Sequence, residues 1–331
     1  MTWTAQSLTQ LATGYWPAAT LIAAVRLRLF ETLDGGPASA DAVAASLSLP
    51  ADRLVHLLDA LAAMRLLTKS PAGDYAIDAD ARPLLSRTSP TCLLDALAYN
   101  ADLYRQWTNL ADTVCGTATP PAGGKQLGDD PAMTRRFVLG MEAKARAFSP
   151  AIAQQIDLGD ARTLLDVGSG PGTLTRLLLE RYSALHATLL DLSPVLAVAR
   201  DVCRASPVFD RLSFHPADYR QDPLPGPFDA VVYAGALHQE TPASAADLFA
   251  KLRHATRPGG RVFIVDLMLD DDRTAPAFSA LFQLNMMLLR PGARVFSVSE
   301  VIAVMRDAGF VDVSAEPVDA TPYRIVRAET R

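Results

Sequence analysis

The chain has 331 residues, of which 50% are hydrophobic and 20% are charged, and its formal net charge is −5. This composition predicts a globular protein large enough for two domains, and the acidic balance makes nucleic acid and anionic membranes poor partners. No apolar run approaches the ~20 residues of a membrane span, and no basic start with an apolar segment marks a signal peptide, so we expect a cytoplasmic protein.

The first half of the chain, residues 1 to about 155, is expected to be mostly helical. Leucine and valine recur at every fourth position over 19–33 and predict one amphipathic helix. A second helical pattern covers 51–67, and residues 66–77 then form two strand-like runs around Ser-Pro-Ala-Gly-Asp, which is a hairpin signal. Helices followed by a hairpin are the pattern of a winged helix.

Winged helices often bind DNA, so a regulator without catalytic activity is one alternative. The helix that would enter the DNA groove, 51–64, carries only Arg53 and His56 against Asp52 and Asp59. A helix that reads DNA usually presents a basic face. We therefore favour a dimerisation domain over residues 1–155 that binds no nucleic acid.

From about residue 160 the pattern changes to short apolar runs separated by helical stretches. The runs lie at 162–167, 187–191, 211–215, 228–233 and 260–267. Strands that alternate with helices predict a parallel sheet covered on both faces. A last helix precedes two runs, 312–318 and 323–329, which can pair as antiparallel edge strands. We assign this second domain to residues 156–331.

A glycine-rich turn follows the first of these strands, in the segment Leu-Leu-Asp-Val-Gly-Ser-Gly-Pro-Gly-Thr-Leu. Gly168, Gly170 and Gly172 have Gly-x-Gly-x-Gly spacing, but Thr173 stands where the dinucleotide fingerprint places its third glycine. The loop is therefore less suited to a pyrophosphate, although glycine still lets a ligand lie close to the backbone. Asp166, at the end of the strand, favours a cationic group such as a ligand ammonium, directly or through water.

Two more carboxylates follow the next two strands. Asp191 ends the second strand, where a carboxylate can accept hydrogen bonds from ribose hydroxyls. Asp218 follows the third strand and can accept a hydrogen bond from an adenine amino group, with Tyr219 beside the ring. Each residue alone is more often a helix cap. At the tips of three successive strands they describe a pocket for an adenosine with a cationic amino-acid end, and S-adenosylmethionine fits that description.

The motifs LLDVGSGPG, LLDLSP, HPADY and RPGGRVFIVD resemble those of class I S-adenosylmethionine-dependent methyltransferases. The whole chain resembles the caffeic acid O-methyltransferase-like family, which includes plant phenolic methyltransferases and bacterial enzymes of natural-product biosynthesis. The resemblance implies an α/β fold: a Rossmann-like, seven-stranded methyltransferase domain preceded by a mostly helical, winged-helix-like dimerisation domain. It implies a homodimer, the cofactor S-adenosylmethionine, and O-methylation of an aromatic small molecule, as in antibiotic biosynthesis. The cofactor contacts are expected from Asp166, Gly168, Ser169, Gly170, Gly172, Asp191, Leu192, Asp218 and Tyr219.

The resemblance also places His238 at the position of the family's catalytic base. A phenol with a pKa near ~10 is only about 0.1% ionised at neutral pH, and a well-placed base contributes on the order of 10²–10⁴ in rate. Asp266, at the end of the following strand, is the implied carboxylate that orients the imidazole.

The segment around the histidine departs from the family pattern. Gln239 and Glu240 replace the usual aspartate and tryptophan, and Ala234 stands where a lysine is often found. These differences leave open N- or C-methylation, or a rearrangement without methyl transfer, on the same fold and cofactor.

Substrate contacts are implied for two helical segments. Residues 135–149 supply Phe137 and Met141, and residues 282–289 supply Asn285 and Met286. No cluster of histidine, cysteine and carboxylates has the spacing of a metal site, and the three cysteines are widely scattered. We therefore expect no metal in the mechanism.

Overall fold

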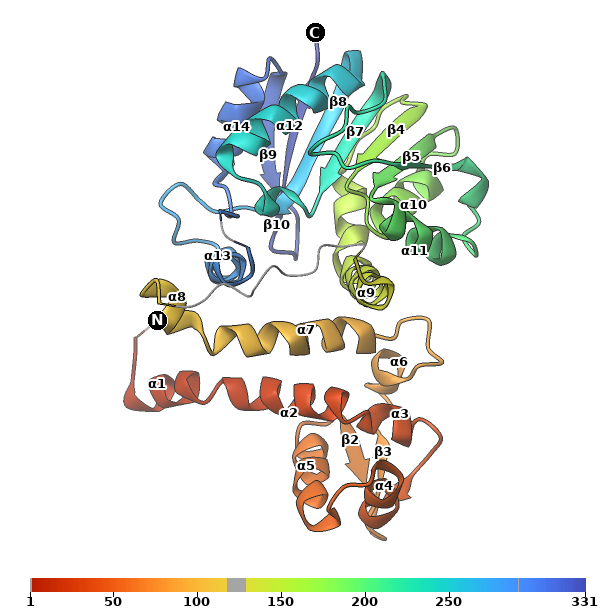
Figure 1. The fold of residues 1–331 in the computed structure, drawn as a ribbon, viewed down its shortest axis with the longest axis vertical. Helices are drawn as coiled ribbons and strands as arrows, with labels where there is room; N and C mark the ends of the chain where they lie inside the picture. The colour runs from red at the N-terminus through yellow and green to blue at the C-terminus, as the bar shows by residue number, and fades with distance from the viewer. Residues whose placement is uncertain (1, 118–128, 291) are drawn as a thin grey trace. The chain divides into compact units, whose positions relative to one another are not determined.

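The computed structural model describes residues 2–117, 129–290 and 292–331. The chain divides into two compact units, Met1–Arg105 and Gln106–Arg331 (Figure 1). The sequence led us to expect the boundary later, between residues 155 and 156. The division falls earlier because the long helix α9 (Pro131–Gln155) packs against α10 (Thr173–Arg181) and α11 (Ser193–Cys203) of the second unit.

The first unit is mostly helical and contains a small antiparallel sheet. Its strands β1 (Ala38–Ser39), β2 (Leu67–Lys69) and β3 (Asp74–Ile77) have the order β1-β3-β2. The helices are α1 (Ala5–Ala12), α2 (Tyr15–Arg26), α3 (Leu29–Leu33), α4 (Ala40–Leu47), α5 (Ala51–Ala63), α6 (Arg82–Leu85) and most of α7 (Leu94–Trp107). The hairpin β2–β3 follows α5 directly, so the winged-helix-like arrangement is confirmed.

Two helices of this unit end earlier than the sequence pattern predicts. The single helix expected over 19–33 is interrupted at Arg28, whose φ of 60° lies in the left-handed region. A residue in that conformation cannot continue a right-handed helix. Helix α5 ends at Ala63, and Arg65, also with a φ of 60°, turns the chain into β2.

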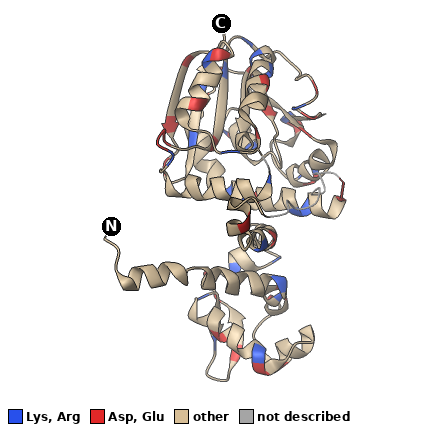
Figure 2. Ribbon diagram, turned by 60° about the vertical axis from the view of Figure 1, so that its left-hand side comes forward, with Lys and Arg blue, Asp and Glu red and all other residues tan. Residues whose placement is uncertain are grey.

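The charges of the first unit are distributed unevenly. Helices α1 and α2 carry no charged side chain before Arg26, whereas α5 carries both signs of charge (Figure 2). Helix α5 therefore lacks the basic face of a DNA-reading helix.

Several large apolar side chains near the N-terminus are exposed: Trp3, Leu8, Leu11, Tyr15 and Trp16. In the described part of the chain, no helix is long and apolar enough to cross a membrane.

The second unit is built on a seven-stranded mixed sheet of order β6-β5-β4-β7-β8-β10-β9. Strand β10 is antiparallel to both of its neighbours, and the other strand pairs are parallel. The strands are β4 (Thr163–Val167), β5 (His186–Asp191), β6 (Leu212–Pro216), β7 (Phe228–Ala234), β8 (Thr256–Leu267), β9 (Val311–Pro317) and β10 (Tyr323–Glu329). This is the expected Rossmann-like methyltransferase fold.

The order of the parallel strands reverses between β4 and β7. From β4 the chain steps outward to β5 and β6, and it then returns to the other side of β4 for β7 and β8. In open α/β sheets, ligands bind at such a switch point, beyond the carboxyl ends of the strands. The glycine turn follows β4 and the His238 segment follows β7, so both lie at this point.

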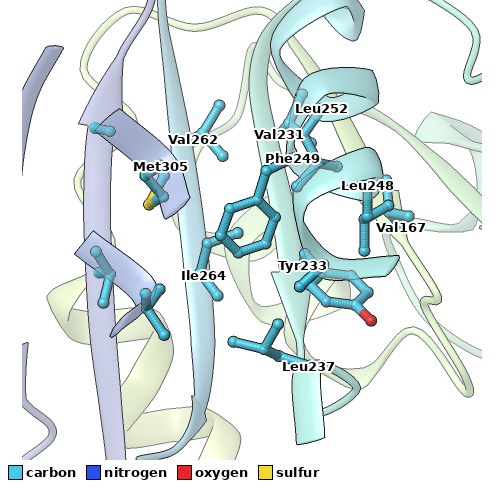
Figure 3. Packing of buried hydrophobic residues seen from close by; sticks show 14 of the residues in the cluster. Val167, Val231, Tyr233, Leu237, Leu248, Phe249, Leu252, Val262, Ile264 and Met305 are labelled. Atoms are coloured by element: carbon cyan, nitrogen blue, oxygen red, sulfur yellow. The ribbon is translucent and has the colours of Figure 1, made fainter. Parts of the chain in front are cut away.

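Helices cover both faces of the sheet and form a hydrophobic core on each. On one face, α12 (Pro242–Ala255) and α14 (Val298–Asp307) pack Leu248, Phe249 and Met305 against the strands (Figure 3). On the other face, the end of α9 and helix α10 pack against the sheet. Close packing on both faces makes the strand ends a rigid support for a site.

Two further helices belong to the second unit. Helix α13 (Ala277–Leu289) packs against the short helix α8 (Leu110–Val114). Two short 3-10 turns complete the unit, η1 (Phe209–Arg211) before β6 and η2 (Leu237–Gln239) after β7.

Candidate active site

The glycine turn is held by the neighbouring strand. The backbone amides of Gly168 and Ser169 donate to the carbonyl of Leu190, at 2.8 and 3.1 Å. Gly168 and Gly170 have φ angles of 64° and 53°, a region that favours glycine. A Cβ on Gly168 would also lie 3.3 Å from the ring of Tyr219, so the tyrosine lies close against the turn.

One buried and one half-buried carboxylate flank this turn. Asp166 is 3% exposed and accepts a hydrogen bond from Thr175 Oγ1 at 2.5 Å. Burial raises the pKa of Asp166 to about 7. Asp191 accepts from the amides of Gly170 and Leu192, and burial raises its pKa to about 6. Each carboxylate is costly to ionise where it stands, which favours a ligand that brings hydrogen bonds or positive charge.

Asp218 and Tyr219 lie at the third strand tip. The Asp218 carboxylate accepts from the amide of Arg220 at 3.0 Å and from Gln221 Nε2 at 2.7 Å, so it also organises its own turn. The hydroxyl of Tyr219 donates to Glu240 Oε1 at 3.1 Å. The structure thus brings the sequence-predicted cofactor residues to one edge of the sheet.

The turn has the properties of a site for an adenosine-bearing cation. The hydroxyl oxygen of Ser169 is buried, and the described residues offer it no hydrogen-bond partner. A Cβ built on Gly170 meets no atom within 4 Å, so the space above the turn is open. An unpartnered hydroxyl, open space and two adjacent carboxylates together fit S-adenosylmethionine better than they fit a phosphate ligand.

The His238 side chain is fixed by Asp266. His238 Nδ1 lies 2.8 Å from Asp266 Oδ1, and the His238 amide donates to Asp266 Oδ2 at 3.2 Å. The amide of Leu267 donates to the same carboxylate at 2.7 Å, and Asp266 is 1% exposed. With Asp266 as the acceptor of this contact, as it is for the two backbone amides, Nδ1 is the donor. The other ring nitrogen, Nε2, is then left with a lone pair that can accept a proton.

Helix α13 crosses this histidine. The ring of Phe282 meets the imidazole edge to face, with centroids 4.9 Å apart. One turn further on, Asn285 accepts a hydrogen bond from Trp107 Nε1 at 3.2 Å, and Met286 is buried. Asn285 and Met286, expected at the substrate, therefore lie on the helix that contacts the histidine, and Phe282 is a contact that the sequence did not single out.

The two predicted substrate residues of α9 have different surroundings. Phe137 packs in a small cluster with Val138, Leu192 and Val195, on the side of the cofactor turn. Met141 is half-buried on the same helix. The role of Phe137 and Met141 at the substrate stays a prediction.

Glu240 is a buried carboxylate that sequence reasoning had treated only as a departure. It is 2% exposed and accepts from Arg220 Nε at 2.8 Å, from Tyr219, and from Ser244 Oγ at 2.6 Å. It stands two residues after His238. Glu240 therefore joins the histidine segment to the loop that carries Tyr219.

A second unpredicted carboxylate, Glu142, links α9 to the cofactor turn. It is 3% exposed and accepts from Arg176 Nη2 at 2.7 Å, from Arg146 Nε at 2.9 Å, and from Thr173 Oγ1. Thr173 is the first residue of α10 after Gly172. No local pattern could have revealed the contact, because Glu142 and Thr173 are 31 positions apart.

Cys203 packs against the glycine turn. Its sulfur lies 3.5 Å from the carbonyl oxygen of Pro171, and burial raises the pKa of the thiol to about 11. A Cβ on Gly172 would come within 2.7 Å of Leu189 and 3.6 Å of this sulfur, so the turn packs closely here. Over the described ranges, no group of three histidine, cysteine or acidic residues is arranged to hold a metal ion.

Comparison with known proteins agrees with this geometry. Residues 112–311 match the model of an O-methyltransferase domain, and residues 9–87 match the O-methyltransferase dimerisation domain. The chain is 30% identical over 310 residues to the 3-hydroxy-5-methyl-1-naphthoate 3-O-methyltransferase of Streptomyces sahachiroi, covering 92% of this chain and 89% of that protein. It is 29% identical to the tetracenomycin polyketide synthesis 8-O-methyl transferase TcmO of Streptomyces glaucescens, with 93% and 92% covered.

A solved structure resembles the whole chain. PigF with S-adenosylhomocysteine bound superimposes with a TM-score of 0.87 at 27% identity, covering 99% of this chain and 100% of that one. The fold and site define a class I methyltransferase. The chain belongs to the O-methyltransferase family with an N-terminal dimerisation domain, and it is an S-adenosylmethionine-dependent O-methyltransferase. The alternative of a DNA-binding regulator finds no support in these matches.

Proposed function

We propose that the enzyme methylates the hydroxyl of an aromatic natural-product intermediate, with His238 as the base and Asp266 as its orienting partner. The observation that carries this proposal is the 2.8 Å contact between His238 Nδ1 and Asp266 Oδ1, at the sheet edge that also carries the glycine turn. The aromatic substrate class is supported by the relatives, which are named for a hydroxynaphthoate and a polyketide.

In this mechanism Nε2 of His238 takes the proton from the substrate hydroxyl. Asp266 holds Nδ1 protonated and stabilises the positive charge that the ring acquires. The bound cofactor supplies a methyl group on a sulfonium, and transfer to the new phenolate needs no metal. Phe282, packed edge to face against the imidazole ring, restricts its rotation.

The proposed cofactor contacts divide between the two ends of the ligand. Asp166 would neutralise the ammonium, while the Ser169 hydroxyl and the backbone of Gly168, Gly170 and Gly172 line the middle of the pocket. Asp191 would receive the ribose hydroxyls, with Leu192 beside them, and Asp218 and Tyr219 would hold the adenine. Tyr219 lies against Gly168, and this proximity supports a single continuous pocket.

We also propose that the protein is a cytoplasmic homodimer formed through its dimerisation domain. The exposed apolar side chains of α1 and α2 support the homodimer, because contiguous exposed apolar surface marks interaction sites. Sedimentation equilibrium measures the mass directly, and a stable monomer of 35.5 kDa would contradict the proposal.

The function itself is tested by product analysis. Purified enzyme and S-adenosylmethionine are offered phenols, catechols, hydroxynaphthalenes and hydroxyquinones, together with matched aryl amines. We expect a mass gain of one methyl group on a phenolic oxygen. Methylation confined to the amines, or to ring carbon, would replace O-methylation by N- or C-methylation. Full cofactor binding with no methylated product from any compound would favour non-methylating chemistry.

Cofactor affinity is expected to rise between pH 5.5 and 7, by roughly tenfold. Because burial raises the pKa of Asp166 to about 7, the carboxylate that would hold the ammonium ionises over this range. The ligand amine stays protonated below a pKa of about 7.7. Isothermal titration of S-adenosylmethionine at several pH values measures the effect, and Asp166→Asn should bind weakly with a flat pH profile.

In the ligand-free protein, the raised pKa of Asp166 makes the folded state less stable as the pH rises. A carboxyl whose folded pKa lies above its unfolded value stabilises the fold only while it is protonated. The stability contribution of Asp166 is therefore complete below pH 3.8 and is lost as the pH rises through about 7.

A cofactor affinity that falls from pH 5.5 to 7, or that Asp166→Asn leaves unchanged, would contradict the proposed role of Asp166 in binding the ligand ammonium.

A further inference from the structure

One face of helix α13 lies along the catalytic segment. Phe282, Met286 and Arg290 follow one another at four-residue steps, which places them on one side of the helix or at its end. Phe282 contacts the ring of His238. Eight residues later, Arg290 Nη1 donates to Oε1 of Gln239, the residue next to the histidine, at 3.0 Å. The Arg290 guanidinium is therefore hydrogen-bonded to the residue that follows the proposed base in the chain.

The charge of Arg290 has no carboxylate partner in the described part of the chain. Its neighbours differ in this respect, because Arg220 pairs with Glu240 at 2.8 Å and Arg294 pairs with Glu300. The residues outside the described ranges contain no aspartate or glutamate. Gln239 is a neutral amide and occupies one of the five donors that a guanidinium carries.

The surroundings of Arg290 disfavour an isolated positive charge. Partial burial lowers the pKa of its guanidinium and the nearby charge of Arg220 lowers it further, while Glu240, Tyr219 and Tyr233 act in the opposite direction. Glu240 already forms an ion pair with Arg220, and a half-buried cation without an ion-pair partner of its own is stabilised by an anion that binds to it. Because Gln239 adjoins His238 in the chain and Phe282 of the same helix contacts the imidazole, we place an anion bound by Arg290 beside the aromatic substrate.

We propose that Arg290 binds a carboxylate carried by the aromatic substrate, and that this contact selects aromatic hydroxy acids over their neutral analogues. The planar guanidinium matches a carboxylate through paired hydrogen bonds. The proposal rests on the proposed function, because it assumes that the reacting hydroxyl points to His238. Gln239 then acts as a neutral support that orients Arg290 without neutralising it.

A purely structural role for Arg290 makes a different prediction. The arginine ends α13, where a cation is favoured by the helix dipole. That interaction would stabilise the helix equally in the presence of any substrate. Discrimination between an acid and its amide therefore separates the two roles.

The test compares hydroxynaphthoates with their primary amides, which have nearly the same shape and no charge. Turnover is measured with S-adenosylmethionine, and binding is measured by calorimetry on the enzyme loaded with S-adenosylhomocysteine. For the wild type we expect kcat/KM and affinity to favour the acid by roughly 10- to 100-fold. Arg290→Gln should reduce this ratio to near one by weakening the acid, while values for the amide stay within about twofold.

A second variant keeps the arginine but supplies it with an internal partner. Gln239→Glu places a carboxylate at the 3.0 Å contact and should also abolish the preference for acids. Arg306→Gln is the matched control, because this exposed arginine of α14 lies outside the site. It makes the same change of charge and should leave the ratio unchanged.

Each outcome distinguishes this proposal from the proposed function. Methylation of both compounds without preference, or a preference that survives Arg290→Gln, overturns the carboxylate site while O-methylation stands. Acids that bind through Arg290 but are never methylated support the site and contradict the proposed reaction. If no acid among the positional isomers binds to the loaded enzyme, the site is overturned.

Discussion

Replacing His238 by alanine is expected to lower kcat by on the order of 10²–10⁴-fold, with little change in the affinity for S-adenosylhomocysteine. The imidazole is the proposed proton acceptor for the substrate hydroxyl, and the proposed cofactor contacts come from other residues. Single-turnover rates and calorimetry on the same preparation separate the chemical step from cofactor binding. The loss should diminish at high pH, where the phenol ionises without help.

Two companion variants sharpen this experiment. Asp266→Asn keeps the size of the side chain, but its amide can donate to Nδ1 and favour the wrong tautomer, so a loss of roughly 10²-fold or more is expected. His186→Ala removes an exposed histidine at the start of β5 and serves as the matched control. A wild-type rate in His238→Ala would remove the histidine from the mechanism and leave only proximity to explain catalysis.

Replacing Glu240 by alanine is expected to destabilise the second unit by about 2–4 kcal/mol. Removing one partner of a buried ion pair typically costs about 3–5 kcal/mol, and the cost is reduced here because the Arg220 side chain is 31% exposed. The variant also leaves the hydroxyls of Tyr219 and Ser244 without their acceptor. The apparent KM for S-adenosylmethionine should rise, because the loop that carries Tyr219 loses its anchor.

Thermal unfolding and steady-state kinetics measure the two effects. At about 2–4 °C per kcal/mol, the melting temperature should fall by roughly 5–15 °C. Glu240→Gln keeps an acceptor and should lose less. Asp201→Ala breaks an exposed pair with Arg135, in which both side chains are 54% exposed, and should cost under about 1 kcal/mol. If Glu240→Ala had the same melting temperature as the wild type, the ion pair between Glu240 and Arg220 would not stabilise this loop.

Much of the second unit follows from local sequence patterns. The alternation of short apolar runs with helices predicted the parallel strands, and the two last runs predicted β9 and β10. The glycine turn and the carboxylates at three strand tips were predictable because each follows its strand directly. The pairing of His238 with Asp266 was expected only through the family resemblance, since 28 residues separate them.

What the sequence could not reveal are contacts between distant polar residues. Glu142 lies in a helix whose pattern shows no sign of its burial, and Arg176, one of its partners, follows 34 residues later. Arg290 and Gln239 are 51 positions apart. Such pairs depend on how the elements pack and leave no periodic signal. The interruption at Arg28 was missed for the opposite reason, because the apolar period continues through it.

The buried sulfur beneath the glycine turn has a practical consequence for thiol chemistry. With a pKa of about 11, the thiol of Cys203 is ionised in only about one molecule in 10⁴ at pH 7. Alkylating reagents therefore react with it slowly, because the thiolate is the nucleophile. Cys115, which ends α8, is exposed. Cys92 is half-buried, so a maleimide dye reacts first at Cys115 and leaves the turn intact. Because α8 packs against α13, the emission of that dye would report on the helix whose Phe282 contacts His238.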